Sequence, residues 1–278
     1  MDFNLTPDQQ NIRQAILKHC TRFPDSYWLE HDRDGVFPND FFQSLVDAGW
    51  LGIAMPSEYG GTGLGITEAA VMMQAIAESG AGMSGASAVH IPVFSVQPVV
   101  LFGTQEQKAR ILPEVVSGKD RVCFAVTEPN AGLNTTEITT RAERRSGGYM
   151  VNGDKIWISS AQVSSKMLLL ARTTPLDQVK RKTEGLSLFY TDLDRAKIEV
   201  RLIHKMGRHA VDSNMLFIHD LWVPEQDRIG AEGEGFKLLL HGLNPERVLV
   251  AAEAVGIGRA ALHRAARYAR ERIDFNRP

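Results

Sequence analysis

The sequence predicts an α+β fold: an all-helical N-terminal domain, a β-rich middle domain built as a barrel or small sandwich, and the start of a C-terminal helical domain. Three stretches lead to this prediction. Helix caps and helical hydrophobic spacing run from residue 4 to about 118, short β-rich segments run from Arg121 to Pro224, and a long amphipathic pattern follows Gly235. We therefore expect three domains, with boundaries at residues 1–120, 121–230 and 231–278.

The N-terminal region begins with a well-specified helix. Thr6-Pro7-Asp8-Gln9 is a capping box with proline at the first helical position. Further helices are expected over residues 39–48, from Thr67 onwards and over residues 84–102. A second capping box, Thr104-Gln105-Glu106-Gln107, predicts the start of one more helix.

The middle region has the turn signals of a β-domain. Glycine pairs and turn residues separate its apolar runs, and Asn152-Gly153 is the strongest hairpin signal. After Gly235 the pattern is helical again. We expect one long amphipathic helix from Pro245, in its first turn, to about Phe275.

The composition is that of an ordinary globular protein. Of 278 residues, 44% are hydrophobic and 23% charged, and 31 Lys and Arg against 33 Asp and Glu leave a formal net charge of −2. These values exclude disorder and coiled coil as dominant states. They also argue against a nucleic-acid partner, because phosphate binding requires a basic surface.

Several common chemistries have no signal here. Cys20 and Cys123 are the only cysteines, and the eight histidines are scattered, so we expect neither a disulfide framework nor a metal site and interpret the histidines as core or surface residues. The sequence contains no GxGxxG, GxxxxGK[ST], HExxH or GxSxG motif. The sequence therefore lacks the usual signatures of nicotinamide binding, P-loop hydrolysis, zinc proteolysis and serine hydrolysis.

The location of the protein is predicted from what the N-terminus lacks. MDFNLTPDQQ has neither the basic nor the apolar region of a signal peptide, and we find no run of about 18 apolar residues. We expect a protein without a membrane partner, in the bacterial cytoplasm or, if processed, in the mitochondrial matrix.

Two motifs carry most of the functional information. Residues 125–132 read AVTEPNAG, and residues 155–159 read KIWIS after Tyr149 and Asn152-Gly153. In these motifs the chain resembles the acyl-CoA dehydrogenase family, in which a TEP-x-AG-SD signature precedes a Y-x-NG-x-K-x-WI-[ST] segment. Further matches extend the resemblance over essentially the whole chain: Tyr59-Gly60-Gly61, Lys205-Met206-Gly207, Val223-Pro224, Gly235-Phe236-Lys237, Glu246-Arg247 and Arg272 to Phe275.

The resemblance implies a non-covalently bound FAD and assigns residues to it. Thr127 and Ser159 would offer hydroxyls to the flavin, and Trp157 would lie against it, although a lone tryptophan is more often a core residue. Arg272 and Phe275 would reach the FAD of a neighbouring subunit, which implies a homotetramer or homodimer. The full set of cofactor-binding residues is Phe124, Val126, Thr127, Gly132, Leu133, Trp157, Ser159, Arg272 and Phe275.

The resemblance also implies a carboxylate base that faces the flavin across the substrate. Most family members carry it in the C-terminal helical domain, of which we expect residues 231–278 to form only the first helices. A smaller branch, including isovaleryl- and long-chain-type enzymes, has it immediately before an arginine on the long helix, and Glu246-Arg247 matches that position. We predict Glu246 as the base. The alternative is that a glutamate beside Pro245, in a first helical turn, only complements the helix dipole.

The substrate contacts follow the same comparison. Asn244, Arg247 and Leu133 match positions that contact the CoA ester. Leu133 and Asn134 stand where the signature has serine and aspartate, so any contact from Leu133 must come from its backbone. We also expect the long helix to show an uncovered apolar stripe, because a further helical domain packs on it in complete family members.

The implied activity is FAD-dependent α,β-dehydrogenation of an acyl-CoA thioester to the trans-2-enoyl-CoA, as in fatty-acid β-oxidation. A glutamate takes the proton, the hydride passes to flavin N5, and electron-transfer flavoprotein is the electron acceptor. Two alternatives stay open: an acyl-CoA oxidase or flavin monooxygenase relative, and an inactive truncated fragment that binds flavin or CoA. The acyl group is not determined by these motifs.

Overall fold

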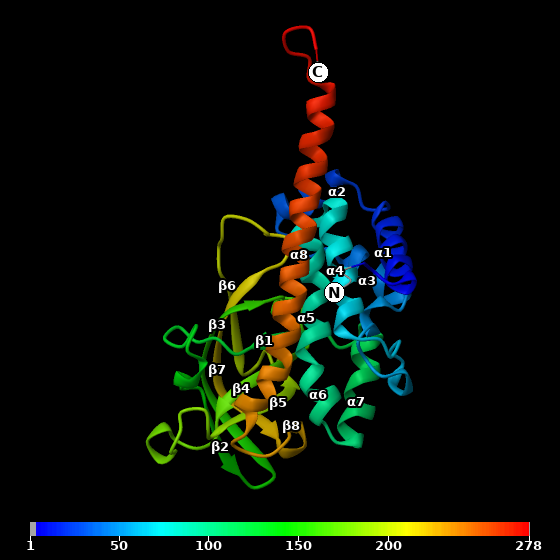
Figure 1. The fold of residues 1–278 in the computed structure, drawn as a ribbon. Helices are drawn as coiled ribbons and strands as arrows, with labels where there is room; N and C mark the ends of the chain where they lie inside the picture. The colour runs from blue at the N-terminus through cyan, green and yellow to red at the C-terminus, as the bar shows by residue number, and fades with distance from the viewer. Residues whose placement is uncertain (1–3, 278) are drawn as a thin grey trace.

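The computed structural model describes residues 4–277 and has the α+β architecture that the sequence predicts. Figure 1 shows a helical part and a sheet-rich part side by side, with one long helix running along their junction and projecting beyond both. The N-terminal helices are α1 (Pro7–Cys20), α2 (Asp25–Asp34), α3 (Asn39–Asp47), α4 (Ile66–Ile76), α5 (Gly82–Ser95), α6 (Gln97–Phe102) and α7 (Gln105–Val116).

Both predicted capping boxes are confirmed. The Thr6 hydroxyl accepts from the Gln9 amide at 3.2 Å, and the Thr6 amide donates to Gln9 Oε1 at 3.1 Å. Thr104 and Gln107 make the same reciprocal pair at 3.2 and 2.9 Å. These bonds satisfy amides that a helix start otherwise leaves without partners, so they fix where α1 and α7 begin.

The segment from α4 to α6 is the most apolar helical stretch that passes a length and composition test for a membrane span among residues 4–277. By length and composition alone, Ile66–Phe102 could cross a membrane, with a mean hydropathy of 1.5 in its most apolar window. However, 83% of that window is buried inside the protein. This is the environment of a core helix, and the segment is interrupted by a π-helical turn at Ala77–Ala81, where Gly80 has a φ of 108°.

The middle domain is one eight-stranded sheet with the strand order β6-β7-β3-β2-β4-β5-β8, and β1 pairs in parallel with β4. Its inner face buries a cluster that includes Cys123, Tyr149 and Phe189. The strands are β1 (Val122–Ala125), β2 (Arg141–Arg145), β3 (Gly148–Ser159), β4 (Lys166–Arg172), β5 (Leu186–Asp192), β6 (Ile198–Leu202), β7 (Ser213–Pro224) and β8 (Arg228–Ile229).

The hairpin predicted at Asn152-Gly153 is wrong. These residues lie inside β3, where its register with β7 shifts, and the turn into β3 contains Gly147 instead, with a φ of 82°. Asn152 uses its side chain across the strands, accepting from the Asp220 amide at 2.9 Å. Gly153 is required because a Cβ there would lie 2.6 Å from the Thr140 Cα. The dipeptide marks a β-bulge, which needs the same backbone freedom as a turn.

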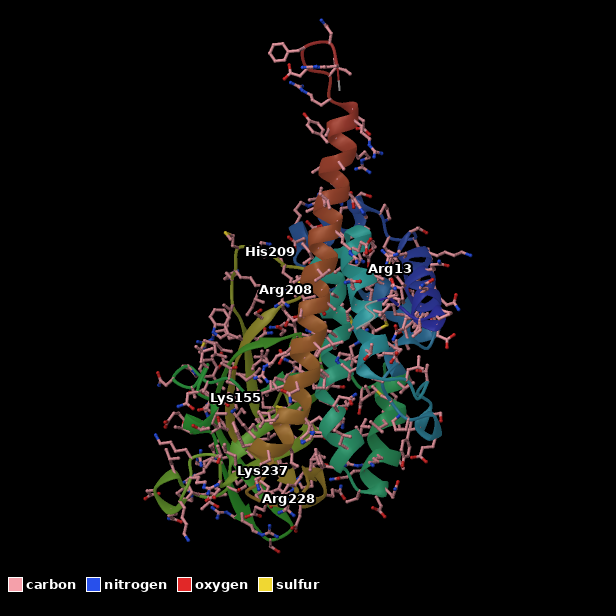
Figure 2. The ribbon with its side chains drawn as sticks, viewed as in Figure 1. Arg13, Lys155, Arg208, His209, Arg228 and Lys237 are labelled. Atoms are coloured by element: carbon pink, nitrogen blue, oxygen red, sulfur yellow. The ribbon has the colours of Figure 1, made fainter. Side chains whose placement is uncertain are left out.

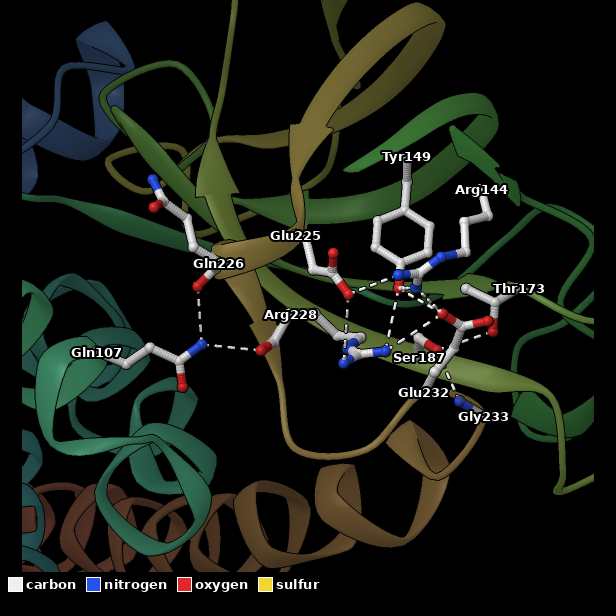
Figure 3. A network of polar contacts seen from close by, with 10 residues as sticks. All are labelled: Gln107, Arg144, Tyr149, Thr173, Ser187, Glu225, Gln226, Arg228, Glu232 and Gly233. Carbon is white, nitrogen blue, oxygen red and sulfur yellow. Dashed lines mark hydrogen bonds and ion pairs between the residues drawn. The ribbon is translucent and has the colours of Figure 1, made fainter. Parts of the chain in front are cut away.

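A polar network fixes the chain just before the last helix (Figure 3). The buried Tyr149 donates to Glu232 Oε2 at 2.5 Å, and Arg144 bonds the same carboxylate at 2.6 Å. Gln107, which already caps α7, donates its other amide atom to the Arg228 carbonyl at 2.8 Å. The motif residue Tyr149 therefore holds the segment that leads into the last helix.

The last helix, α8 (Gly235–Glu271), has 37 residues and begins earlier than predicted. A Cβ at Gly235 would lie 2.5 Å from the Leu188 amide nitrogen, so glycine lets the helix start directly against β5. Pro245 lies inside the helix and not in its first turn. An interior proline removes one backbone hydrogen bond and crowds the carbonyl of the preceding turn, a cost that tertiary packing can offset, and this is why sequence rules misplace the start.

The two faces of α8 differ in their exposure to solvent. Leu249, Glu253 and Gly256 are buried against the N-terminal helices. Val255 and Leu262, one heptad apart, are 50% and 67% exposed. The predicted uncovered apolar stripe is confirmed.

Candidate active site

A cavity of about 440 Å³ lies at the junction of α5, β1, β3 and α8. It brings together residues that are far apart in the sequence and that reach it from both domains. Its lining includes these predicted site residues: Phe124, Val126, Thr127, Gly132, Leu133, Trp157, Ser159, Glu246 and Arg247.

Three predicted residues do not line the cavity. Asn244 lies one turn before Arg247 on α8, and its Oδ1 accepts a hydrogen bond of 2.8 Å from Arg247 Nη1. Arg272 and Phe275 follow the end of α8, where the chain projects from the body, and Phe275 is 90% exposed. Their predicted contact with the cofactor of a neighbouring subunit stays a prediction.

The segment that follows β1 and carries Thr127 is held by a buried lysine. Lys155 Nζ donates to the carbonyls of Val126 and Leu170 at 3.0 and 2.8 Å and to Glu128 Oε1 at 2.9 Å. Burial lowers the pKa of Lys155 to about 8, while Glu128 opposes that shift. The Ile156 amide adds a backbone bond to the Thr127 carbonyl at 2.9 Å. The two sequence motifs are thus one structural unit.

Trp157 has an unusual backbone conformation. It lies where β3 loses its register with β7, and its φ is 62°. A positive φ costs a bulky residue about 1–3 kcal/mol, so the surrounding strand must enforce it. The result is an indole that is 58% exposed on the cavity wall. Trp157 is therefore not the core residue that a lone tryptophan usually is.

Ser159 is hydrogen-bonded to a half-buried arginine that sequence reasoning missed. Arg208, in the loop between β6 and β7 (Figure 2), donates to Ser159 Oγ at 3.2 Å and to Ser87 Oγ on α5 at 2.8 Å. Burial lowers the pKa of the Arg208 guanidinium, whose ordinary value leaves it charged at neutral pH. Its only sequence signal is its position directly after Lys205-Met206-Gly207.

Glu246 is half-buried on the cavity wall. Burial raises the pKa of its carboxyl, and His90 and Arg247 partly offset that shift. Because α8 begins at Gly235, Glu246 is well inside the helix. The alternative that it serves a helix N-terminus does not hold, since that effect is confined to the first turn.

A buried His–Glu pair on the same wall was also missed. His90 Nδ1 on α5 lies 2.7 Å from Glu253 Oε1 on α8. Glu253 is fully buried, and its Oε2 has no hydrogen-bond partner within residues 4–277. His90 itself lines the cavity. The two residues are 163 positions apart in the sequence, so no local pattern relates them.

Comparison with known proteins matches all three parts of the chain to one protein family. Residues 6–119, 123–221 and 233–278 match the N-terminal, middle and C-terminal domains of acyl-CoA dehydrogenase, respectively. An acryloyl-CoA reductase (NADH) from Anaerotignum propionicum is 31% identical over all of this chain and 70% of its own length.

Solved structures show the same likeness. Butyryl-CoA dehydrogenase from Megasphaera elsdenii matches with a TM-score of 0.91 and 28% identity, over 100% of this chain and 73% of its own. A glutaryl-coenzyme A dehydrogenase bound to glutaryl-CoA matches with a TM-score of 0.93 and 26% identity, over 100% and 70%.

Proposed function

This chain belongs to the acyl-CoA dehydrogenase family, and on that premise we propose that it removes hydrogen from Cα and Cβ of an acyl-CoA thioester to form the trans-2-enoyl-CoA. Members of the family are FAD flavoproteins. The observation that carries the proposal is the shared cavity, which Glu246 lines together with Thr127, Trp157 and Ser159.

The residues of the cavity fit a flavin. Trp157 offers a flat apolar face, held by a strained backbone, and Thr127 and Ser159 offer hydroxyls. At Gly132 a Cβ would meet no atom within 4 Å, so the backbone is open to close approach by a phosphate-bearing ligand. Phe124, Val126 and the backbone of Leu133 complete the cofactor contacts that we propose. When bound, FAD supplies the acceptor for the hydride that leaves Cβ.

Glu246 is the proposed base. It takes the proton from Cα, whose acidity is increased by the neighbouring thioester carbonyl. Its raised pKa suits this task, since a base with a pKa closer to the working pH accepts a proton more readily. The apolar wall of Phe94, Phe124 and Leu243 limits water around the reacting carbons.

Arg247 and Asn244 are proposed to bind the CoA portion. Both are exposed at the end of the cavity-lining part of α8, and their mutual hydrogen bond holds the guanidinium in place. A guanidinium binds phosphate well, and an amide suits the polar atoms of pantetheine. This arrangement would orient the thioester toward Glu246.

We propose electron-transfer flavoprotein as the electron acceptor. An oxidase would use the same cavity, so the two functions are separated by the fate of the electrons. A dehydrogenase consumes little oxygen during turnover with acyl-CoA and is strongly stimulated by electron-transfer flavoprotein; an oxidase consumes oxygen in proportion to the acyl-CoA used.

The decisive experiment is an anaerobic visible-absorption titration of the purified protein with a panel of acyl-CoA esters. We expect flavin bands that bleach on addition of the correct ester. Flavin bands that persist with every ester, in a protein that binds those esters, would contradict the proposed reaction. Absence of flavin after reconstitution with FAD would contradict the proposed cofactor.

A further inference from the structure

The apolar wall of the cavity contains a polar group, His90, to which the proposed dehydrogenation assigns no contact with substrate, although it lowers the pKa of Glu246. Ile91 and Phe94 on α5 and Leu240 and Leu243 on α8 make this wall apolar. His90 interrupts it, at the point where α5 and α8 are joined by the pair of His90 with Glu253. Removing an α-proton requires one base, and Glu246 already supplies it.

Glu253 fixes the imidazole in one orientation. The carboxylate accepts at Nδ1 over 2.7 Å, so Nδ1 carries a proton and Nε2 is the atom left for a ligand. Nε2 makes no hydrogen bond to any residue between 4 and 277 and is not sealed from solvent. The guanidinium of Arg208 interacts electrostatically with Glu253. The same guanidinium donates to Ser87, one turn before His90 on α5.

A buried, hydrogen-bonded His–Glu pair is costly to place in an apolar wall, and replacement of such a pair by apolar residues is often neutral or stabilising. A site built to hydrogen-bond a substrate group also rejects analogues that lack the group, because its own polar atom is then left unpaired. Resting on the proposed function, we infer that the substrate is a hydroxyacyl thioester, whose hydroxyl lies beyond the reacting Cα and Cβ and hydrogen-bonds to His90 Nε2.

A hydroxyl fits this position better than a carboxylate. A hydroxyl can both donate and accept, so it pairs with Nε2 whether the ring is neutral or charged. A second carboxylate would instead share the cavity with Glu246, and two anions in one desolvated site repel each other. Glu246 must be ionised to act as a base, which makes this repulsion a direct penalty on the reaction.

The test compares two kinds of ester on three proteins. Acyl-CoA esters with a hydroxyl on C4, C5 or C6 are each paired with the alkyl ester of the same carbon count. Wild type, His90→Phe and His90→Gln are measured for dissociation constants by calorimetry and for kcat/KM by flavin reduction. His90→Phe keeps a ring of similar size beside Phe94, and His90→Gln keeps a hydrogen-bonding group.

We expect wild type to prefer one hydroxyacyl ester over its alkyl partner by about 10- to 100-fold in both measurements. His90→Phe should lose that preference, and His90→Gln should retain part of it. Because His90 also lowers the pKa of Glu246, the readout is the ratio between the two esters and not the rate on either one. Glu253→Gln, which keeps the side-chain shape, should weaken the preference because a neutral amide accepts from Nδ1 less strongly than a carboxylate.

The outcomes separate the two proposals. Turnover without any preference for a hydroxyl, or a preference unchanged in His90→Phe, overturns the inference and leaves the dehydrogenation intact. A binding preference that depends on His90 without flavin reduction by either ester overturns the proposed reaction and leaves the inference intact. If His90→Phe fails to fold, the ratio of the two esters on wild type and His90→Gln decides.

Discussion

Lys155 and Glu128 form a buried ion pair of 2.9 Å directly behind the segment that follows β1 and carries Thr127. Lys155 is fully buried and Glu128 is 4% exposed. The remaining oxygen of Glu128 accepts from the Thr139 amide and hydroxyl at 2.7 and 2.8 Å. One ion pair therefore connects β3, the Thr127 turn and the segment before β2, which together form one side of the candidate site.

Replacing Lys155 with methionine should destabilise the protein by about 3–5 kcal/mol, because Glu128 would be left buried without its partner. Urea denaturation measures the change. The double variant Lys155→Met, Glu128→Leu is the matched control. It should recover part of the loss, since no charge is then stranded, and a double variant no more stable than the single one would contradict this account.

Replacing Glu246 with glutamine should leave flavin binding intact and abolish flavin reduction by acyl-CoA. Glutamine keeps the shape but cannot accept the α-proton. The variant should also gain stability at neutral pH, because it removes a carboxylate that burial disfavours in its charged form. The absorption titration and a thermal unfolding curve test both effects. Full activity of Glu246→Gln would eliminate this residue as the base.

The pH dependence of kcat/KM should show an acidic limb that reports Glu246. Burial raises its pKa above the ordinary 4.5, and only the carboxylate can accept a proton, so activity falls as the pH decreases through that raised value. Arg247 opposes the shift. In Arg247→Ala the limb should therefore move to higher pH. A limb that moves to lower pH, or that persists in Glu246→Gln, would assign it to another group.

Arg247→Ala should raise the dissociation constant of the CoA ester about 10-fold or more and leave FAD content unchanged. Calorimetry with the ester and the ratio of flavin to protein absorbance give the two values. Arg259, which lies further along the same helix and bonds Gln74, provides the control position. Equal weakening in Arg259→Ala would indicate a general effect of charge.

Two glycines of α8 provide a paired test of its packing. A Cβ at Gly256 would lie 2.4 Å from the Gln74 carbonyl oxygen, whereas a Cβ at Gly258 would meet nothing within 4 Å. Gly256→Ala should destabilise the protein by about 1–3 kcal/mol through forced separation of α4 and α8. Gly258→Ala should stabilise it by about 0.5–1 kcal/mol, since alanine favours a helix interior. Thermal unfolding of both variants is the measurement.

Sequence patterns predicted local structure well where the cause is local. The capping boxes at Thr6 and Thr104 satisfy amides three residues away, so they can be recognised in a short window. The start of α8 and the bulge at Gly153 depend on contacts with β5 and with Thr140, which are remote in the sequence. In both places the local rule recognised a meaningful residue but assigned it a wrong position: Pro245 to a first helical turn and Gly153 to a hairpin turn.

The candidate site also contains two kinds of residue, those that local sequence motifs reveal and those that only the folded structure reveals. Thr127, Trp157 and Glu246 are found from motifs that are continuous in the sequence. His90, Glu253 and Arg208 come from three separate elements and have no motif of their own. Their significance depends on burial and on one another, which is a property of the folded protein.

The first part of α8 packs against the rest of the protein and its last part does not, so we expect the backbone of the two parts to differ in mobility. Arg264, which bonds Asp25 at 2.6 Å, is the last residue of α8 with a hydrogen bond or ion pair to the helical domain among residues 4–277. Beyond it the helix continues for about two turns with every residue exposed. Such a short stretch is marginal in water on its own, so its amides should exchange with solvent deuterium rapidly while those around Glu246 stay protected. Fraying at this end would therefore proceed without disturbing the geometry of the cavity.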